Sequence, residues 1–321
     1  MNKKVLRFFT LALLSAMMVV GFASCEKDPV TASNEVIHKD HEDPVKAVIL
    51  LVDGHLHGTY SFHQNPDVEG VKYLKRKQQI TFNLTKEGWK IADDSPKKFL
   101  VRSVGKNAIG GQVYGLWIYY YNVKGELMNS QFVENGQDKI HQHFFIPRNV
   151  EPTFDGVKEV TDNDAKSLYK YMYCDTTPWD KTMHSGEGKL SGDKNPIGFK
   201  GYFTFLKTRK QFNMNIELMH AAKSKFDEHG KTSPFYEPSK AQRQRDLWDL
   251  KISIPVIVYA NQLESINDAE PTTPEKDIPA DEMKLLQSIA HAYGITWKDA
   301  LNDIYAIITG DVDPESGQLW F

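Results

Sequence analysis

The sequence predicts a mainly β fold, in which antiparallel β-sandwich units are followed by a C-terminal pair of helices. Short runs that are β-branched, or that alternate apolar and polar residues, recur between residues 44 and 262 with turn residues between them. Paired segments with helical spacing and capping residues follow residue 280. The hydrophobic fraction of 40% and the charged fraction of 25% are those of a folded globular chain.

A first, His-rich β-domain is expected over residues 44–160. Its apolar or alternating runs predict strands at 45–52 (VKAVILLV), 79–84, 114–122 and 140–146. After residue 122, the turn residues predict a hairpin whose second strand starts at Leu127. The run 114–122 carries consecutive aromatic residues, so rings lie on both of its faces: one face belongs to the core, and the other is a candidate stacking platform.

A second β-unit is expected over residues 161–262. The spacing predicts a helix over 163–173 and a hairpin that joins 201–206 to 212–220. A long strand is predicted at 247–260, with Pro255 placing it at an edge or a bulge. Two β-units and one extended sandwich both remain open.

The C-terminal region, residues 263–321, reads as a linker followed by two helices. Residues 264–279 are acidic and rich in proline. Helices are predicted at 280–292 and 296–308, with Thr296 as the N-cap and Gly310 as the terminator. Residues 311–317 are expected to be a polar tail.

The first 24 residues have the pattern of a secretory signal peptide. A positively charged start precedes an apolar stretch, Phe8 to Val20, that is too short to span a membrane. The residues Gly21-Phe22-Ala23-Ser24-Cys25 resemble a bacterial lipobox, so Cys25 is the expected lipidation site. Residues 25–43 are then a flexible tether, in which His38 and His41 are expected to be solvated.

The leader resembles that of a Bacteroidetes-type lipoprotein of the outer membrane or periplasm. The resemblance implies membrane attachment through Cys25, a location facing the periplasm or the cell surface, and nutrient capture beside a TonB-dependent transporter. The formal net charge of −3 lacks the basic surplus of a nucleic-acid partner. In the mature chain Cys174 is the remaining thiol, and its aromatic neighbours predict a packed, inert side chain.

The segment from Gly54 to His63 points to metal binding. Strand side chains alternate, so an extended chain places His55, His57 and His63 on one face. A second His-x-His pair, His141 and His143, lies on another predicted strand. Imidazoles at positions i and i+2 of a strand turn to the same ion, and four converge if the two strands are neighbours.

The predicted function is binding of a transition metal ion or metal complex. The main predicted ligands are His55, His57, His141 and His143, supplemented by His63 and His220. The alternative interpretation of His220 is a histidine buried in the core. Zinc is the first expectation, and copper, nickel and haem remain open. The sequence contains no metalloprotease, nucleophile-elbow or phosphate-loop motif, so binding is favoured over catalysis. A His-ligated metalloenzyme and a glycan-binding or adhesive β-sandwich are the alternatives.

Overall fold

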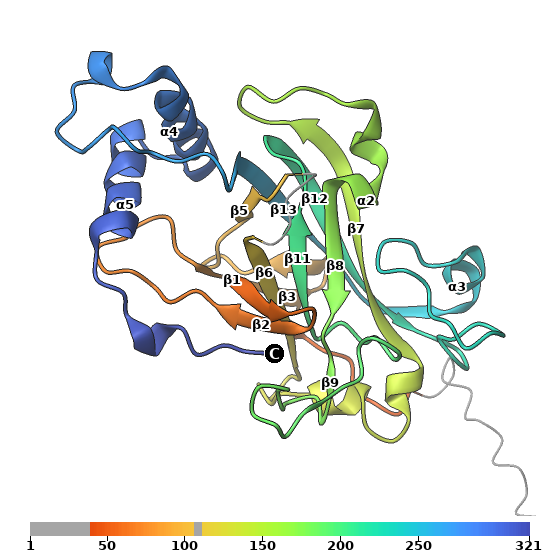
Figure 1. The fold of residues 1–321 in the computed structure, drawn as a ribbon. Helices are drawn as coiled ribbons and strands as arrows, with labels where there is room; N and C mark the ends of the chain where they lie inside the picture. Colours follow the sequence, from red (N-terminus) through yellow and green to blue (C-terminus); the bar gives the residue numbers. More distant parts are fainter. Residues whose placement is uncertain (1–38, 106–110) are drawn as a thin grey trace, which may run out of the picture. The chain divides into compact units, whose positions relative to one another are not determined.

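Two β-sheets packed face to face form the core of the protein (Figure 1). The computed structural model describes residues 39–105 and 111–321. The leader, Cys25 and His38 lie outside the described residues. As predicted, the protein is mainly β, with antiparallel sheets and a C-terminal helical pair.

The first sheet has the strand order β4-β3-β1-β6-β11-β8, with β2 paired to β1. The second sheet has the order β5-β13-β12-β7, in which only the β5–β13 pair is parallel among the described strands. A small ribbon, β9 with β10, stands apart. The strands are β1 (Lys46–Gly58), β2 (Ser61–Gln64), β3 (Lys77–Thr85), β4 (Gly88–Ile91), β5 (Phe99–Ser103), β6 (Val113–Tyr121), β7 (His141–Pro152), β8 (Tyr169–Tyr173), β9 (Thr176–Thr177), β10 (Lys189–Leu190), β11 (Lys200–Phe205), β12 (Lys210–His220) and β13 (Leu247–Asn261).

Strand β1 is buried on both faces, which explains its uninterrupted apolar sequence. Ile49 and Leu51 pack into the core between the sheets. Leu50 and Val52 pack on the opposite face, against a cluster that includes Phe321 from the C-terminus. Both sheets combine strands from residues 44–160 with strands from residues 161–262. The boundary predicted at residue 160 therefore does not separate the sheets, and the strands of the two larger sheets form one interleaved sandwich.

The C-terminal helices follow the prediction closely. α4 (Ala280–Tyr293) and α5 (Trp297–Thr309) pack on the end of β13 through Tyr259 and Ala260. Thr296 caps α5 by accepting a hydrogen bond from the backbone N–H of Asp299, and Gly310 ends the helix. The other helical segments are short: α2 (Ala165–Leu168), α3 (Lys240–Arg245), η1 (Asn129–Phe132), η2 (Gln137–Lys139), η3 (Val160–Asn163), η4 (Glu275–Asp277) and η5 (Pro314–Ser316). Among the described helices, none has the length and apolar character needed to cross a bilayer.

Three local predictions were wrong. The helix expected over 163–173 is limited to the single turn of α2, after which β8 begins; Tyr169 and Tyr171 pack into the core with the two-residue period of a strand. Leu127 forms only an isolated bridge with Tyr121, and the chain continues into η1. The third is the hairpin predicted between 201–206 and 212–220: β11 lies in the first sheet and β12 in the second.

Pro255 lies in the part of β13 that has a neighbouring strand on one side only. It pairs with Asn213 of β12 on one side, whereas pairing with β5 begins only at Val256. Residues 247–255 of β13 therefore have no β5 neighbour, so Pro255 does not need to donate a hydrogen bond on that side. This agrees with the prediction that Pro255 lies at a sheet edge.

A buried ion-pair network holds the crossover from β11 to β12. Asp162 accepts hydrogen bonds from Lys207 Nζ at 2.9 Å, from Lys210 Nζ at 2.8 Å and from the backbone N–H of Glu159 at 2.8 Å. All three of these charged side chains are at most 3% exposed. The two buried lysine charges therefore need Asp162 as their partner. This contact directs the chain between β11 and β12 across the sandwich instead of into a tight turn.

We expect Asp162→Asn to destabilise the protein by about 2 kcal/mol or more at pH 7. The free energy of unfolding of the variant should also depend less on pH in the acidic range. Burial acts to raise the pKa of Asp162, but the Glu159 N–H and the two lysines outweigh it and lower the pKa from 3.8 to about 2. A depressed folded-state pKa stabilises the protein above pH 4, and this contribution disappears as the pH falls from 4 to 2. Urea unfolding between pH 2 and 7 measures it. Equal stability of variant and wild type at pH 7 would contradict this assignment.

Candidate metal centres

Three histidines converge at the β1–β2 hairpin, and we call His55, His57 and His63 the open site. Nε2 of His55 lies 3.1 Å from Nε2 of His57, which lies 3.4 Å from Nδ1 of His63. None of the three is buried, and His57 is exposed. The site therefore combines three convergent imidazoles with a side open to solvent.

A hairpin, not an extended strand, brings these residues together. An extended chain would separate His55 from His63 by about 26 Å. Instead the chain reverses at residues 59–60, and His63 pairs directly opposite His55. His57 lies at a bulge, where the register between β1 and β2 shifts. Gly54 makes the close approach possible, because a Cβ there would lie 2.2 Å from the carbonyl oxygen of His63.

Outer hydrogen bonds orient two rings of the open site. Nδ1 of His55 donates to Oδ1 of Asn65 at 2.7 Å, and Nδ2 of Asn65 donates to Asp53 at 2.7 Å. Nε2 of His63 donates to the carbonyl oxygen of Gly317 at 3.0 Å. Because these oxygens only accept, the outer nitrogens carry the ring protons and the inner nitrogens present lone pairs. Metal-binding histidines are oriented in this way.

The C-terminal segment completes the open site. Trp320 stacks on His63 with ring centroids 3.7 Å apart, and His184 stacks on Trp320 at 3.8 Å. Phe321 is fully buried against Phe62 and Trp117. Figure 1 shows the dark blue C-terminal chain returning from α5 to the β1–β2 hairpin. The polar tail that we predicted at 311–317 thus leads into a docked aromatic segment.

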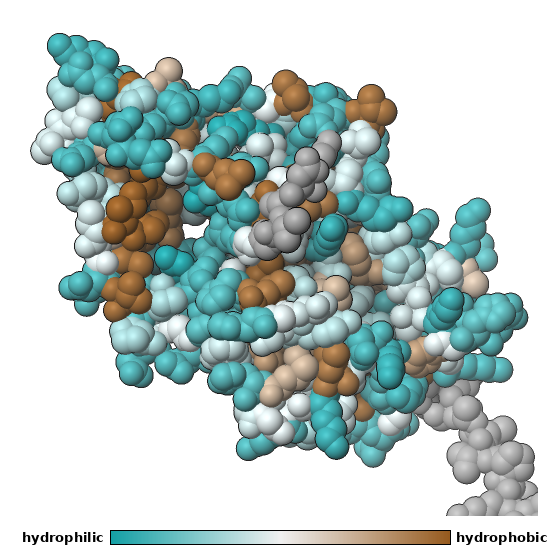
Figure 2. Space-filling model, viewed as in Figure 1, coloured by the Kyte–Doolittle hydropathy of each residue, from teal (hydrophilic) through white to brown (hydrophobic). Residues whose placement is uncertain are grey.

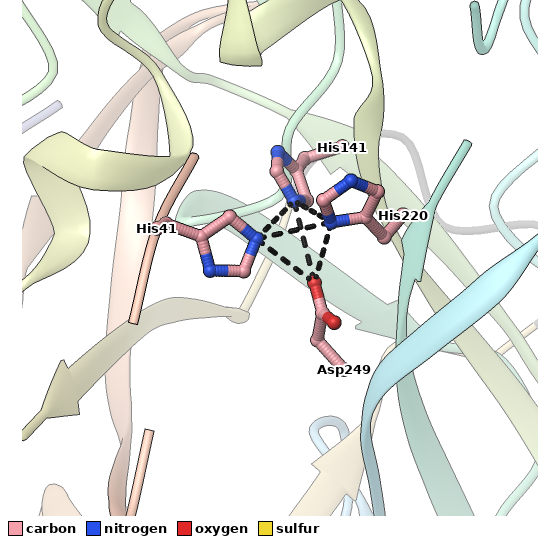
Figure 3. A group of neighbouring side chains, drawn as sticks. All are labelled: His41, His141, His220 and Asp249. Carbon is pink, nitrogen blue, oxygen red and sulfur yellow. Dashed lines mark hydrogen bonds and ion pairs between the residues drawn. The ribbon is translucent and has the colours of Figure 1, made fainter. Parts of the chain in front are cut away.

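A second group is fully buried, and we call His41, His141, His220 and Asp249 the closed site (Figure 3). The side chains of all four are 0% exposed. The distances between His41 Nε2, His141 Nε2, His220 Nδ1 and Asp249 Oδ2 run from 3.0 to 3.3 Å. The four atoms are therefore almost equally spaced, as the corners of a regular tetrahedron are.

The size of this tetrahedron matches zinc. With an edge of about 3.2 Å, its centre lies about 2.0 Å from every corner, which matches the usual zinc–nitrogen and zinc–oxygen distances of about 2.0–2.2 Å. Three imidazoles and one carboxylate also form a normal donor set for this ion. All four positions are taken by side chains, which is typical of a structural zinc site and not of a catalytic one.

Three strands and the segment before β1 supply the closed site. His141 at the start of β7 pairs directly with His220 at the end of β12. Asp249 lies at a bulge of β13, between Leu250, which pairs with Leu218, and Trp248, which pairs with Met219. The extra residue turns the Asp249 side chain to the histidines. His41 comes from the chain just before β1.

The protons of the closed site leave lone pairs facing one another. Nδ1 of His41 donates to the carbonyl oxygen of Glu42 at 2.8 Å, and Nδ1 of His141 donates to that of Gln137 at 2.9 Å. In the neutral rings, the inner Nε2 atoms are then two acceptors only 3.2 Å apart. A metal ion between these atoms would be bound by both lone pairs. A proton bridges two atoms at a time, whereas the equal spacing of all four fits one central ion.

Charge in the closed site favours a cation as well. Burial lowers the pKa of His141 to about 4, which keeps this ring neutral at pH 7. Burial acts to raise the pKa of Asp249, but hydrogen bonds from the three histidines and Lys39 hold it well below its ordinary value. For His41, burial is outweighed by Asp249, and the pKa is raised. The site thus offers an anionic carboxylate beside neutral imidazole.

The two predicted His-x-His pairs do not form one site. His55 and His57 belong to the open site, and His141 belongs to the closed site. His143 belongs to neither: its Nδ1 donates to the carbonyl oxygen of Ile197 at 2.8 Å, so its Nε2 accepts from the Tyr120 hydroxyl at 2.6 Å. Burial lowers the pKa of His143 to about 3. His143 is therefore a satisfied core histidine, which corrects its assignment as a main ligand.

Sequence reasoning missed His41, Asp249 and Trp320. His41 is buried instead of solvated in a tether. Because His41 is surrounded by the charged residues Asp40, Glu42 and Asp43, the sequence predicted a solvated linker there. No local sequence pattern predicts the bulge at Asp249. His220 was assigned as supplementary, and the structure places it in the closed site. Cys174 is buried, as predicted, and burial raises the pKa of its thiol well above the ordinary value.

The aromatic strand does not provide an exposed platform. Trp117 and Tyr120 of β6 are buried on opposite faces, in two different clusters, and Tyr119 packs against the Trp117 cluster. The strand serves the two-sided core, and nothing in it favours the glycan-binding alternative.

A cavity of about 430 Å³ adjoins the open site. Asp53 and His55 line it on the sheet side, and Leu285, Ile289 and Ile304 line it on the helix side. Figure 2 shows hydrophobic side chains over the helices at the left, beside a hollow. Burial raises the pKa of Asp53 against the opposing charge of Arg76. The cavity thus combines an apolar wall with a polar floor.

No protein-family model, curated protein or solved structure matches this chain. Function is therefore inferred from the two groups of side chains.

Proposed function

We propose that this protein is a cell-envelope lipoprotein that binds a divalent transition metal ion, zinc in the first place, at the open site. The observation that carries the proposal is the convergence of three imidazole nitrogens at a solvent-exposed hairpin. Two of these rings direct their protons outward to fixed acceptors. Three ligands and an accessible fourth position suit an ion that is captured and released.

The open site suits a bare ion better than haem. A porphyrin fills the equatorial positions of its iron, so two imidazoles bound to it lie on opposite faces of the ring. Here Nε2 of His55 and Nε2 of His57 are only 3.1 Å apart. Copper and nickel bind such nitrogen sites as well, and copper binds them more tightly in vitro. Metal availability in the envelope then decides which ion is bound.

The leader supports the cellular setting of this proposal. The lipobox-like residues before Cys25 imply a lipid anchor in the outer membrane, facing the periplasm or the cell surface. An exposed, exchangeable metal site on such a protein fits metal or nutrient acquisition, with a TonB-dependent transporter as partner.

Metalloenzyme activity is the second candidate, favoured by the cavity beside His55. A hydrolytic zinc enzyme needs a base near the open coordination position. Among the described residues, no Asp or Glu belongs to the three-histidine group. Asp53 acts on His55 through Asn65, which is an orienting role. Binding is therefore the better-supported function.

We expect His57→Ala to weaken zinc binding at the open site by about 100-fold or more, because loss of even an outer partner costs about 10–100-fold. The experiment is a zinc titration of the full chain, purified without an affinity tag, with elemental analysis of the protein as isolated. His229→Ala is the matched control, since His229 is an exposed surface histidine outside both sites. Unchanged zinc affinity in His57→Ala, or equal loss in the control, would refute metal binding at the open site.

A further inference from the structure

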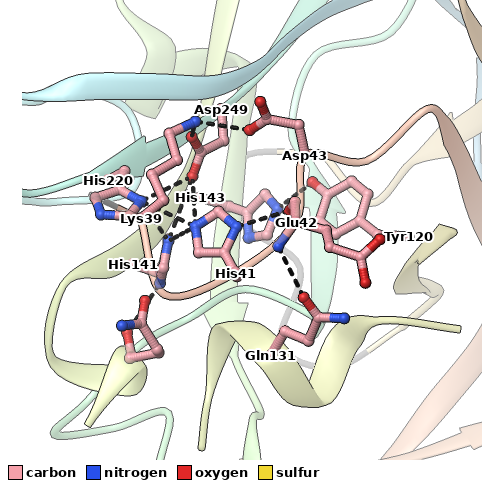
Figure 4. A network of polar contacts seen from close by, with 11 residues as sticks. Lys39, His41, Glu42, Asp43, Tyr120, Gln131, His141, His143, His220 and Asp249 are labelled. Atoms are coloured by element: carbon pink, nitrogen blue, oxygen red, sulfur yellow. Dashed lines mark hydrogen bonds and ion pairs between the residues drawn. The ribbon is translucent and has the colours of Figure 1, made fainter. Parts of the chain in front are cut away.

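The segment before β1 is attached to the sandwich by backbone hydrogen bonds of Val45, with Tyr121 at 3.0 Å and with Leu84 at 2.8 Å, and by the side-chain contacts in Figure 4. In residues 39–45, only His41 and Pro44 are buried. Lys39 Nζ contacts Asp249 at 2.5 Å and Asp43 at 2.7 Å, and the backbone N–H of Glu42 donates to the side chain of Gln131 at 2.9 Å. The contacts of Asp43 and of Glu42 are exposed to solvent and contribute little each, whereas Lys39 also reaches the buried Asp249. The His41 side chain itself is 0% exposed.

His41 reaches the interior through the closed site. Its ring packs on Phe132 with centroids 4.5 Å apart, and its Nε2 lies 3.0 Å from His220 and 3.2 Å from His141. The other ligands belong to β7, β12 and β13, which are adjacent strands of one sheet. The strands supply three preassembled ligands, and the segment before β1 supplies the fourth.

We propose that the closed site is a structural zinc site that clamps the segment leading to Cys25 onto the β-sandwich. When zinc is bound, His41 is its fourth ligand and residues 39–44 are held against η1. When zinc is removed, the inner nitrogens of His41 and His141 face each other without a metal ion, and the segment is released. Metal thus sets whether residues 39–44 are held on the sandwich.

The clamp does not depend on the open site, and the two sites are expected to exchange zinc differently. Zinc at the open site is accessible to solvent, so a chelator removes it rapidly. Zinc at the closed site leaves only when the segment opens, because all four ligand side chains are 0% exposed. The full chain loaded with zinc should therefore release one equivalent quickly and a second one at least about tenfold more slowly.

Zinc release to a chromogenic chelator tests this assignment in the full chain. His41→Ala is expected to lose the slow phase and keep the fast one, His57→Ala is expected to do the reverse, and His229→Ala is expected to keep both. A slow phase that persists in His41→Ala, or its absence from the wild type, overturns the clamp. If the wild type releases zinc in the slow phase only, the proposed function is overturned and the clamp stands.

Two further measurements test the clamp with the His41 side chain in place. Wild-type protein loaded with Co²⁺ should show the intense visible absorption of a tetrahedral site, and this signal should persist in His57→Ala. Trypsin cleavage after Lys39 should accelerate by about tenfold or more when the slow zinc is stripped. Weak, octahedral-type cobalt absorption or a cleavage rate independent of zinc would refute the clamp.

Discussion

Asp249→Ala is expected to lower the free energy of unfolding of the zinc-loaded protein by about 3–5 kcal/mol, the usual cost of removing one partner from a buried charge cluster. The Asp249 carboxylate contacts His41, His141 and His220 inside the protein and Lys39 at its margin. Its removal leaves a cation without its only carboxylate ligand in the closed site. Urea unfolding of the full chain in excess zinc measures the loss.

Asp43→Ala is the matched control for this prediction. Asp43 also contacts Lys39, but its side chain is 69% exposed, so its loss should cost less than about 1 kcal/mol. The metal contribution is isolated by repeating the unfolding experiment with a strong chelator, in which the wild type should lose most of its advantage over Asp249→Ala. If that advantage persists in chelator, the Asp249–Lys39 pair, and not zinc, stabilises this part of the fold.

Phe321→Ala is expected to destabilise the protein by about 3–5 kcal/mol and to weaken zinc binding at the open site. The Phe321 ring is fully buried, with centroids 4.7 Å from Trp117 and 5.1 Å from Phe62. Its loss opens a cavity beside β2 and releases Trp320 from His63. Because Trp320 and Gly317 orient His63 from outside, zinc affinity should fall by about tenfold.

Leu263→Ala is the matched control, since Leu263 is a large apolar residue that is 80% exposed. Its effect on both readouts should be small. Unfolding by urea and a zinc titration of the same samples separate the two consequences of Phe321→Ala. A stability loss with unchanged zinc affinity would show that the C-terminal segment packs on the hairpin without supporting the open site.

The elements that local pattern predicted well are those whose neighbours are also local. α5 begins at a capping box formed by Thr296 and Asp299, three residues apart. The apolar run of β1 predicted a strand because β-branched residues pack well in a buried sheet, whichever strands flank it. Pro255 restricted its strand through its own missing N–H. These properties are present in any short window of the chain.

The errors have the opposite cause. The 163–173 segment has helical spacing, but its tyrosines gain more by packing in the core as strand β8. β11 and β12 resemble a hairpin, but buried Lys207 and Lys210 must reach Asp162, which precedes them by more than forty residues. In each case a long-range contact outweighs the local preference.

The sequence by itself determined the mainly β class, the capped helical pair, the buried thiol and the expectation that histidines on strands bind metal. Only the tertiary structure decided which histidines meet. His57 and Asp249 are both aimed by bulges, His63 is placed by a hairpin, and His41 is placed by the return of the chain before β1. Strand alternation predicts a face, but a bulge shifts that alternation by one residue, and its position depends on pairing with a distant strand. For this reason the four predicted main ligands divide between an open site, a closed site and the core.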